Sequence, residues 1–490
     1  MTHLPVLQIA LPLIAAPLCV LLRHARAVQI FAVLVAWACL GIALALLGAA
    51  LPGGAISYEL GGWPAPLGIE YRVDLANAFV LVVVSALGAV VLPIGPGRRG
   101  HAVPPRREYL FYASFLLCMA GLMGVAITGD IFNVFVFLEI SSLAAYTLIA
   151  LGRQRQALRA AFSYLMMGTI GGTFVLIGIG FLYQMTGTLN MADLQRLLPA
   201  VQQSRSVHAA FAFLTVGIGI KLAVFPLHQW LPNAYSFAPP AVSAFLASTA
   251  TKVAYYLLVR LAFGVFGTAY VFGALGLGAL LLPLALLAMF VGALAAIYQS
   301  DLKRLLAYSS VSQIGYMILG LSFGTATGLT GGLVHIANHA LIKGGLFLAV
   351  ACIVAQTGSS ALSDLRGLSR RMPWTFAAIA IGGLGLIGAP GTAGFVSKWY
   401  LVLAALSAGR PEVAFAVLLS SLLAGIYVWR VLEAAWFRDP VQSAPRGEAP
   451  LRILIPTWVL IGASLYFGVF TEWTAGIAEA AARQLLEGAP

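Results

Sequence analysis

Apolar segments of about 20 residues recur from one end of this 490-residue chain to the other, and they restrict it to one kind of fold. As a helix, such a segment is just long enough to cross the ~30 Å hydrocarbon core of a bilayer. The charged fraction agrees with this, because it is 9% here and about 25% in soluble domains. No low-complexity linker divides the segments. We therefore expect one all-α integral membrane domain over residues 1–490.

The apolar pattern predicts fourteen membrane spans separated mostly by short polar loops. The first is expected to be a span of the mature protein rather than a signal peptide, because it has no basic flank and no small-residue cleavage site. The predicted spans cover approximately residues 7–22, 28–51, 75–94, 109–128, 131–151, 161–186, 209–230, 240–263, 269–298, 309–323, 328–355, 374–400, 413–437 and 452–471.

Loop charges predict the orientation in the membrane. Lys and Arg residues concentrate in alternate loops, and the positive-inside rule assigns those loops to the cytoplasm. Both termini and the polar loop 52–74 then face outward. The net charge of +12 thus reflects membrane topology rather than binding to nucleic acid, and we expect a multi-pass protein of the cell (inner) membrane. The predicted inner loops hold Arg23, Arg26, Arg98, Arg99, Arg106, Arg107, Arg153, Arg155, Arg159, Lys303, Arg304, Arg366, Arg370, Arg371, Arg438, Arg446 and Arg452, and the outer loops hold Arg72, Arg196, Arg205, Arg410 and Arg483.

Cofactor signatures are missing from the sequence. The four cysteines stand singly in apolar segments without a CxxC pair, so neither an iron–sulfur cluster nor a structural zinc site is expected. The stretch "GLGLIG", residues 383–388, matches the dinucleotide fingerprint, but it lies within an apolar span, where close helix packing explains its glycines better. We expect no cofactor and no catalytic chemistry in the chain itself, although it could be a subunit of an ion-translocating oxidoreductase.

Five ionisable residues stand inside predicted spans: Glu139, Lys221, Lys252, Lys343 and Lys398. A charge at the bilayer centre costs at least about 2.5–3.5 kcal/mol, so five would cost more than about 12 kcal/mol together. Mutual pairing, polar neighbours or internal water must offset that cost. A structural ion pair is enough to explain one buried lysine, whereas four lysines in separate spans favour an ion pathway.

Histidines accompany one of these lysines. His335, His339 and Lys343 recur at i, i+4 and i+8, which places them on one helix face, called here the histidine–lysine stripe. Two histidines one turn apart could bind a metal, but no third ligand accompanies them. A proton relay is the better interpretation, and no metal site is expected.

Two predicted spans contain helix breakers. Pro226 interrupts the seventh span, and Gly388–Gly391 with Pro390 interrupts the twelfth. A broken helix is tolerated at membrane depth only beside protein or a wet cavity. Paired broken helices in corresponding parts of a chain indicate an ion pathway in transporters built from inverted repeats.

The chemistry of the buried groups follows from burial. Burial lowers the pKa of a lysine and raises that of a carboxylic acid, and a nearby opposite charge reverses both shifts. A lysine that approaches and leaves a carboxylate can therefore load and release a proton near neutral pH. We predict that Lys221, Lys252 and Lys398 carry protons and that Glu139 is the partner of Lys221. The histidine–lysine stripe would be the bridge, since histidine titrates near neutrality.

Asp301, Lys303 and Arg304 come between two predicted spans. Charged residues in that position are typical of a solvated turn, so we expect all three to face water.

Several long motifs, in order, resemble one known family. They are "KLAVFPLHQWLPNAYSFAPPAVSAFLASTATKVAYYLLVR", "QSDLKRLLAYSSVSQIGYMILG", "GGLVHIANHALIKGGLFL" and "GAPGTAGFVSKWYL". Over about residues 70–440 the chain is similar to the antiporter-like membrane subunits of Mrp-type cation/proton antiporters, respiratory complex I and membrane-bound hydrogenases. The resemblance implies fourteen core helices with two inverted five-helix repeats, about 109–263 and 269–437, and broken helices seven and twelve. Its functional residues fall on Glu139, Lys221, Lys252, Lys398 and the histidine–lysine stripe.

One motif departs from the family pattern, because "RAAFSY" has Arg159 and Ser163 where many members have "EAxFKY". This puts in doubt a membrane-entry role for a lysine there, without affecting the central residues.

The D subunit of an Mrp-type Na⁺/H⁺ antiporter fits the length and Lys398 best. The alternative is a proton-pumping membrane-arm subunit of a complex I-like NADH:quinone oxidoreductase or of a membrane-bound hydrogenase. Either implies a hetero-oligomeric membrane complex as partner, with protons and also Na⁺ as candidate ions. A quinone-binding redox subunit and a self-sufficient solute carrier fit less well, because the chain has neither redox ligands nor a localised substrate site.

Overall fold

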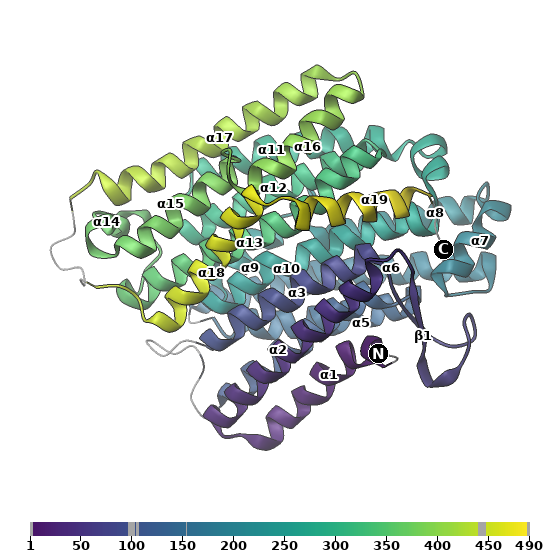
Figure 1. Cartoon of the computed structure of the whole chain (residues 1–490), viewed down its shortest axis with the longest axis horizontal. Helices are drawn as coiled ribbons and strands as arrows, with labels where there is room; N and C mark the ends of the chain where they lie inside the picture. Colours follow the sequence, from purple (N-terminus) through teal and green to yellow (C-terminus); the bar gives the residue numbers. More distant parts are fainter. Residues whose placement is uncertain (1–2, 97–102, 104–106, 153, 440–446, 488–490) are drawn as a thin grey trace.

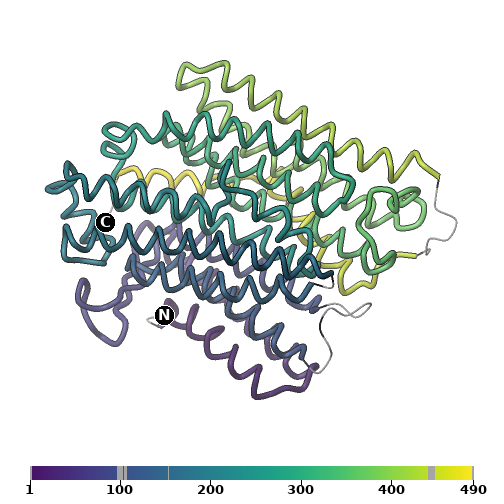
Figure 2. Tube along the Cα trace, turned by 180° about the vertical axis from the view of Figure 1, so that it is seen from behind, coloured from purple at the N-terminus to yellow at the C-terminus, as the bar shows by residue number. Residues whose placement is uncertain are grey.

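The computed structural model describes residues 3–96, 103, 107–152, 154–439 and 447–487. Its helices form one bundle, with the purple N-terminal helices along one side and the yellow-green segment 411–436 along the other, while the yellow C-terminal segment crosses the middle (Figures 1 and 2). In the described part, thirteen helices are long and apolar enough to cross a membrane. Two shorter apolar helices, α15 and α16, follow each other across a break and complete the fourteen predicted spans.

The long helices are α1 (Leu4–Leu22), α2 (Ala25–Ala50), α3 (Leu75–Val91), α4 (Glu108–Ile127), α5 (Ile131–Ala150), α6 (Arg155–Thr186), α8 (Arg205–Leu222), α10 (Pro240–Val259), α11 (Leu277–Ile297), α12 (Leu302–Ser322), α13 (Ala326–Thr357), α17 (Pro411–Trp436) and α18 (Leu451–Val469). The shorter elements are α7 (Met191–Val201), α9 (Trp230–Phe237), α14 (Leu368–Arg371), α15 (Pro373–Ile387), α16 (Ala393–Ser407), α19 (Ile477–Glu487) and the strands β1 (Ile56–Glu59) and β2 (Glu70–Val73).

Burial separates central from peripheral spans. In α10 and α12, 94% of the residues of the apolar window are buried, whereas the figure is 33% in α2, α17 and α18. Exposed Leu, Phe and Trp side chains, such as Leu418, Leu422 and Trp429 on α17, cover the outside of the bundle. The peripheral helices therefore present the lipid-compatible surface, and polar side chains of α10 and α12 are enclosed by protein.

Both predicted helix breaks are present. α8 ends at Leu222 with Ala223 in the left-handed conformation, and Pro226 lies in the turn before α9. α15 ends at Gly388, which is also left-handed and carries no Cβ that would strain the turn. The indole of Trp230 donates to the carbonyl of Ile220 at 2.9 Å, so a carbonyl freed by the first break has a partner.

The predicted polar loop 52–74 contains a β-hairpin that the sequence did not reveal. β1 and β2 pair antiparallel with Ile56 opposite Val73. Next to the hairpin lie α7 and both described ends of the chain (Figure 1), and the ring of His3 contacts the Tyr58 hydroxyl at 3.1 Å. We call this the hairpin end of the bundle. The opposite end carries α14.

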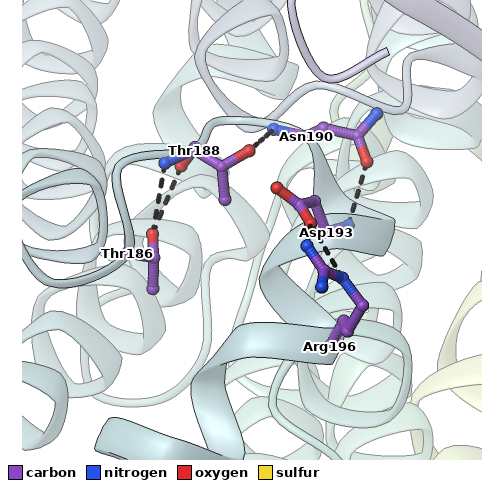
Figure 3. Close-up of polar contacts among 5 residues, drawn as sticks. All are labelled: Thr186, Thr188, Asn190, Asp193 and Arg196. Atoms are coloured by element: carbon purple, nitrogen blue, oxygen red, sulfur yellow. Dashed lines mark hydrogen bonds and ion pairs between the residues drawn. The ribbon is translucent and has the colours of Figure 1, made fainter.

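The connection between α6 and α7 is built from side-chain hydrogen bonds (Figure 3). The Thr186 hydroxyl accepts from the Thr188 amide at 3.4 Å, and the Thr188 hydroxyl accepts from the Asn190 amide at 3.3 Å. Asn190 pairs through the backbone with Asp130, which caps the start of α5.

The same hydrogen bonds recur after α13. The Thr357 hydroxyl accepts from the Ser359 amide at 3.3 Å, and the Ser359 hydroxyl accepts from the Ala361 amide at 3.1 Å. Ala361 pairs with Asp301, which caps the start of α12. Moreover, α6 and α13 both have 32 residues. The elements that follow the two connections, α7 and α14, lie at opposite ends of the bundle (Figure 1).

The expectation that Lys303 faces solvent is wrong. Its side chain is buried, with 7% exposed, and its amine donates to the Ala238 carbonyl at 2.7 Å. Asp301 is held as the cap of α12 rather than left in an open turn. The burial arises because the α9–α10 junction packs over the first turn of α12, an arrangement that loop composition does not reveal. Of the arginines that carry the predicted orientation, Arg98, Arg99, Arg106, Arg153 and Arg446 lie outside the described residues.

An ion pair fastens α3 to the end of α10. The guanidinium of Arg260 donates to Asp74 Oδ2 at 2.5 Å and to the Tyr256 hydroxyl at 2.9 Å. Asp74 also caps α3 by accepting from the Asn77 amide at 3.0 Å. About one-sixth of each charged side chain is exposed, at 16% and 17%, so the pair is screened less than a surface pair.

We expect Asp74→Asn to lower the free energy of unfolding by about 2 kcal/mol, because the amide keeps the helix cap but leaves Arg260 without its counter-charge. Thermal unfolding in detergent would measure it. The control is Asp193→Asn, which removes the exposed pair with Arg196 and should change stability by less than about 0.5 kcal/mol. Equal unfolding temperatures for the two variants would contradict the assignment.

Candidate functional site: a row of buried charged and polar side chains

The first group of buried charges lies between α5 and α8. The Lys221 amine is 3.2 Å from Glu139 Oε1 and donates to the Ser142 hydroxyl at 2.7 Å. Lys221 is 5% exposed, whereas the Glu139 side chain is 26% exposed. Ser142 lies one turn after Glu139, so α5 supplies both partners of the ammonium group. The sequence prediction that Glu139 is the partner of Lys221 agrees with this geometry.

Glycines of α6 make room for the pair. A Cβ at Gly172 would lie 2.3 Å from Glu139 Oε1, and one at Gly168 would lie 1.8 Å from the Tyr146 hydroxyl. The side chains of α5 therefore occupy the space that larger residues on α6 would fill. By contrast, a Cβ at Gly180 meets nothing within 4 Å.

Lys221 also borders a small internal cavity. The cavity has a volume of about 20 Å³, and residues of α5 and α10, including Ser141, Ser142 and Ala250, line it beside the lysine. That is room for one water molecule. The cavity points from Lys221 toward α10, where the next lysine stands.

Lys252 lies deep in α10 and is 1% exposed. Its amine donates to the Ala247 carbonyl and lies 3.4 Å from the Thr251 hydroxyl. The neighbouring hydroxyls of Ser248 and Thr249 bond carbonyls of their own helix. Lys252 thus has backbone and hydroxyl oxygens as partners instead of a carboxylate.

The histidine–lysine stripe runs along the buried face of α13, as predicted from its spacing. The rings of His335 and His339 stack with centroids 5.4 Å apart. The Lys343 amine donates to the Leu306 carbonyl at 2.6 Å and to the Ser309 hydroxyl at 2.5 Å, both on α12. The three members are at most 1% exposed.

The second broken helix holds Lys398. Its amine donates to the carbonyls of Leu386 and Ile387, at 3.0 and 2.8 Å, and to the Ser421 hydroxyl at 2.9 Å. These carbonyls belong to the last turn of α15, where the helix dipole favours a cation. The amine also lies 4.6 Å from the centroid of the Tyr316 ring, in cation–π range.

Contacts continue from Lys398 to the stripe. The Tyr316 ring lies 5.9 Å from the His335 ring, and His335 Nδ1 lies 2.8 Å from the hydroxyl of Ser397, the neighbour of Lys398. The predicted residues therefore form two connected groups, Glu139 with Lys221 and Lys398 with the stripe histidines. Among the described residues, neither Lys252, Lys343 nor Lys398 forms an ion pair.

Many polar atoms in the middle of the site have no partner among the described residues. The set comprises His335 Nε2, both ring nitrogens of His339, Asn338 Oδ1, Gln313 Nε2 and the hydroxyls of Tyr255 and Tyr427. They come from α10, α12, α13 and α17, and all are buried. Buried polar groups normally bond protein or ordered water, so this region is suited to hold water.

The hydroxyls that solvate the amines were not identified from the sequence as site residues. Ser142, Ser397 and Ser421 look like ordinary helix serines. Spacing offered one usable signal, because Ser142 stands at i+3 from Glu139 and so shares its helix face. Ser421 comes from another helix, and no sequence pattern links it to Lys398.

Gly383 and Gly388 of the "GLGLIG" stretch lie in and at the end of α15, and a Cβ at Gly383 would approach Val428 to 2.6 Å. Close packing therefore explains the motif. Within the described ranges, no group of three or more His, Cys, Asp and Glu side chains is placed to hold a metal ion.

The fold and this row of buried charges define a multi-pass helical membrane protein with an internal polar axis. A family model described as the transmembrane part of NADH:quinone oxidoreductase and Mrp antiporters matches residues 128–424. The chain therefore belongs to the NADH:quinone oxidoreductase/Mrp antiporter transmembrane family, as the resemblance indicated.

Full-length relatives agree with the family. The chain is 42% identical to the N subunit of the NADH-quinone oxidoreductase of Desulforudis audaxviator, over 96% of both chains. It is 31% identical to the D subunit of the Na⁺/H⁺ antiporter of Bacillus subtilis, over 99% of this chain and 98% of the relative. Among solved structures, a chain of the Mrp complex from Dietzia superposes with a TM-score of 0.91 at 25% identity, covering 100% of this chain and 98% of that chain.

We expect Gly172→Ala to lower the free energy of unfolding by about 1–2 kcal/mol, because the new methyl group displaces the Glu139 carboxylate from Lys221. Gly180→Ala on the same helix is the matched control. It should be neutral or stabilise by up to about 1 kcal/mol, since alanine favours the helix. Thermal unfolding in detergent checks both. Equal stability of the two variants would show that the carboxylate does not need this space.

Proposed function

We propose that this chain is a proton-translocating antiporter-like subunit of a multi-subunit membrane complex, best described as the D subunit of an Mrp-type Na⁺/H⁺ antiporter. Lys221, Lys252 and Lys398 would carry protons, Glu139 would tune Lys221, and the histidine–lysine stripe would relay protons between the lysines. The observation that carries the proposal is the row of buried amines, of which Lys221 and Lys398 stand beside the two helix breaks.

Lys221 differs from the other two proposed proton carriers in its partners. Its ammonium form has both a carboxylate and a hydroxyl as partners, whereas Lys252 and Lys398 have only neutral oxygens among the described residues. A charge on these two lysines is therefore stabilised less than on Lys221. A proton that leaves the Glu139–Lys221 pair therefore reaches lysines that hold it more weakly. These lysines can release the proton again instead of trapping it.

Water would connect the fixed groups. The one-water cavity beside Lys221 faces α10, and the unpartnered atoms around His339 offer several sites for ordered water. Protons move along hydroxyls, imidazoles and water but not along carbonyls. The relay therefore runs through Ser142, the cavity and the stripe histidines, and continues through Ser397 to Lys398.

The repeated turn supports two structural repeats, which we place at residues 109–263 and 269–437. Matching threonine-based connections follow two helices of 32 residues, and α7 and α14 lie at opposite ends of the bundle (Figure 1). In each proposed repeat the broken helix carries one buried lysine. Lys221 comes before the first break, and Lys398 comes after the second.

The assignment to an Mrp-type complex rests on the antiporter relatives and on the superposition with a chain of the Mrp complex. The higher identity to an oxidoreductase N subunit favours the alternative, a membrane-arm subunit of a complex I-like enzyme. In that case the redox chemistry would belong to partner subunits. Purification of the native complex decides between them: small antiporter subunits support the first, and iron–sulfur or nickel proteins support the second.

Lys221→Ala and Glu139→Ala should each reduce coupled ion movement to background in membrane vesicles that contain the whole complex, because the remaining partner loses its counter-charge. Dye-monitored proton movement is the measurement. Glu433→Gln, which removes an exposed acid paired with Arg438, should keep wild-type rates. Full activity of either alanine variant at normal expression would refute the proposed roles.

Ser142→Ala should slow proton movement about tenfold, because a hydrogen bond to a charged group contributes about 1.5–3 kcal/mol. Thr147→Ala on the same helix is the matched control, since that exposed hydroxyl donates to the Leu143 carbonyl of its own helix at 3.0 Å; its rate should stay within about twofold of wild type. If both variants behave alike, the Ser142 hydroxyl is not part of the path.

A further inference from the structure

Lys303 is a buried amine that the row described above does not include. It stands in the first turn of α12 with 7% of its side chain exposed. An ammonium group has three donors, and the structure gives this one a single acceptor among the described residues, the Ala238 carbonyl at 2.7 Å. In the described part of the chain, no carboxylate lies within ion-pair distance of it. Asp301, two residues away, is occupied by the Arg304 amide and the Ser360 hydroxyl.

Lys303 also lines a large cavity at the end of the bundle opposite the hairpin. The cavity has a volume of about 560 Å³, far more than one water needs, and polar groups of Gln154, Gln356, Glu448 and Arg452 contribute to its wall. It reaches the start of α10 at Ala241 and the buried face of α13 at Ala351. Lys303 is the lysine that lines it.

The same helix leads from the cavity to the histidine–lysine stripe. Lys343 is held by the Leu306 carbonyl and the Ser309 hydroxyl, one and two turns beyond Lys303 on α12. Six residues of helix span about 9 Å. The Lys343 amine already reaches Ser309, so only the stretch between Lys303 and Ser309 remains for water to bridge.

The fold does not require an amine at this position. The matching turn at the hairpin end has Asp130 as the helix cap in place of Asp301, and the residue two positions after the cap is Phe132, which is 43% exposed. The helix start forms there with an apolar side chain. Lys303 is therefore a feature of one half of the molecule, where the large cavity reaches the first turn of α12.

We propose that Lys303 exchanges protons with the water of this cavity and passes them to Lys343. A hydronium ion protonates the neutral amine and leaves water; the ammonium then gives the proton through water and the Ser309 hydroxyl to the neutral amine of Lys343, which becomes the ammonium. The step is reversible, so it serves uptake or release. The proposal rests on the proposed function and adds its connection to bulk water.

The first test compares Lys303→Gln, which keeps a donor for the Ala238 carbonyl, with Lys303→Arg, which keeps the charge but does not release its proton. In vesicles containing the whole complex, both should move protons at least tenfold more slowly at alkaline pH and recover partly as the pH falls, because direct entry from water then suffices. The other charged groups that line the cavity, Asp301, Glu448 and Arg452, stay unchanged. Arg366→Gln, an exposed charge at the same end, should behave as wild type.

Two outcomes overturn the proposal: wild-type rates for both variants at all pH values, or full activity of Lys303→Arg with loss in Lys303→Gln, which indicates a structural charge.

Lys303→Cys supplies an independent test. A membrane-impermeant thiol reagent should label it only from the cavity end, since the four native cysteines are buried, and absence of labelling rules out contact with bulk water. Normal activity of Lys221→Ala would instead refute the proposed function, whatever Lys303 does.

Discussion

The buried ammonium groups of this protein must be stabilised without bulk water. Many of its helix contacts provide oxygen atoms for that purpose. Lys252, Lys343 and Lys398 lie where a bare charge would be strongly disfavoured. Each has carbonyl and hydroxyl oxygens of the protein as partners. Of the buried lysines in the described part of the chain, only Lys221 has a carboxylate within ion-pair distance. The bundle therefore replaces bulk water with fixed dipoles, which stabilise a proton without binding it irreversibly.

The second broken helix supplies part of those dipoles. An intact helix uses its carbonyls internally, whereas the last turn of α15 leaves the carbonyls of Leu386 and Ile387 free for Lys398. At the first break the Ile220 carbonyl accepts from the Ala223 amide and from the Trp230 indole, and Lys221 turns to α5 instead. The two halves thus solve the same problem differently, one with a counter-charge and one with the end of a helix.

The different partners of Lys221 and Lys398 bear on the direction in which protons move. In the proposed mechanism the paired lysine holds its proton more firmly than the lysines beyond it, and a wet cavity opens beside Lys303 at one end of α12. If partner subunits are to drive a reversible proton path, its lysines must hold protons with different strengths, and its two ends must differ in their access to water. The separate turns at Thr186 and Thr357 are held by side-chain hydrogen bonds and keep the ends of the long helices in place.

The sequence predicted the membrane class, the fourteen spans, both helix breaks and the buried charges of the row. Each of these features depends on local composition and on the spacing of residues along one helix. The Glu139–Lys221 pairing could be predicted too, since few acids were available inside the spans. The burial of Lys303, the hairpin in loop 52–74, and the serines and carbonyls that solvate each amine became visible only in the folded chain. Those contacts join helices far apart in the sequence, such as Ser421 with Lys398 and Ser309 with Lys343, and no local pattern records which helix faces meet.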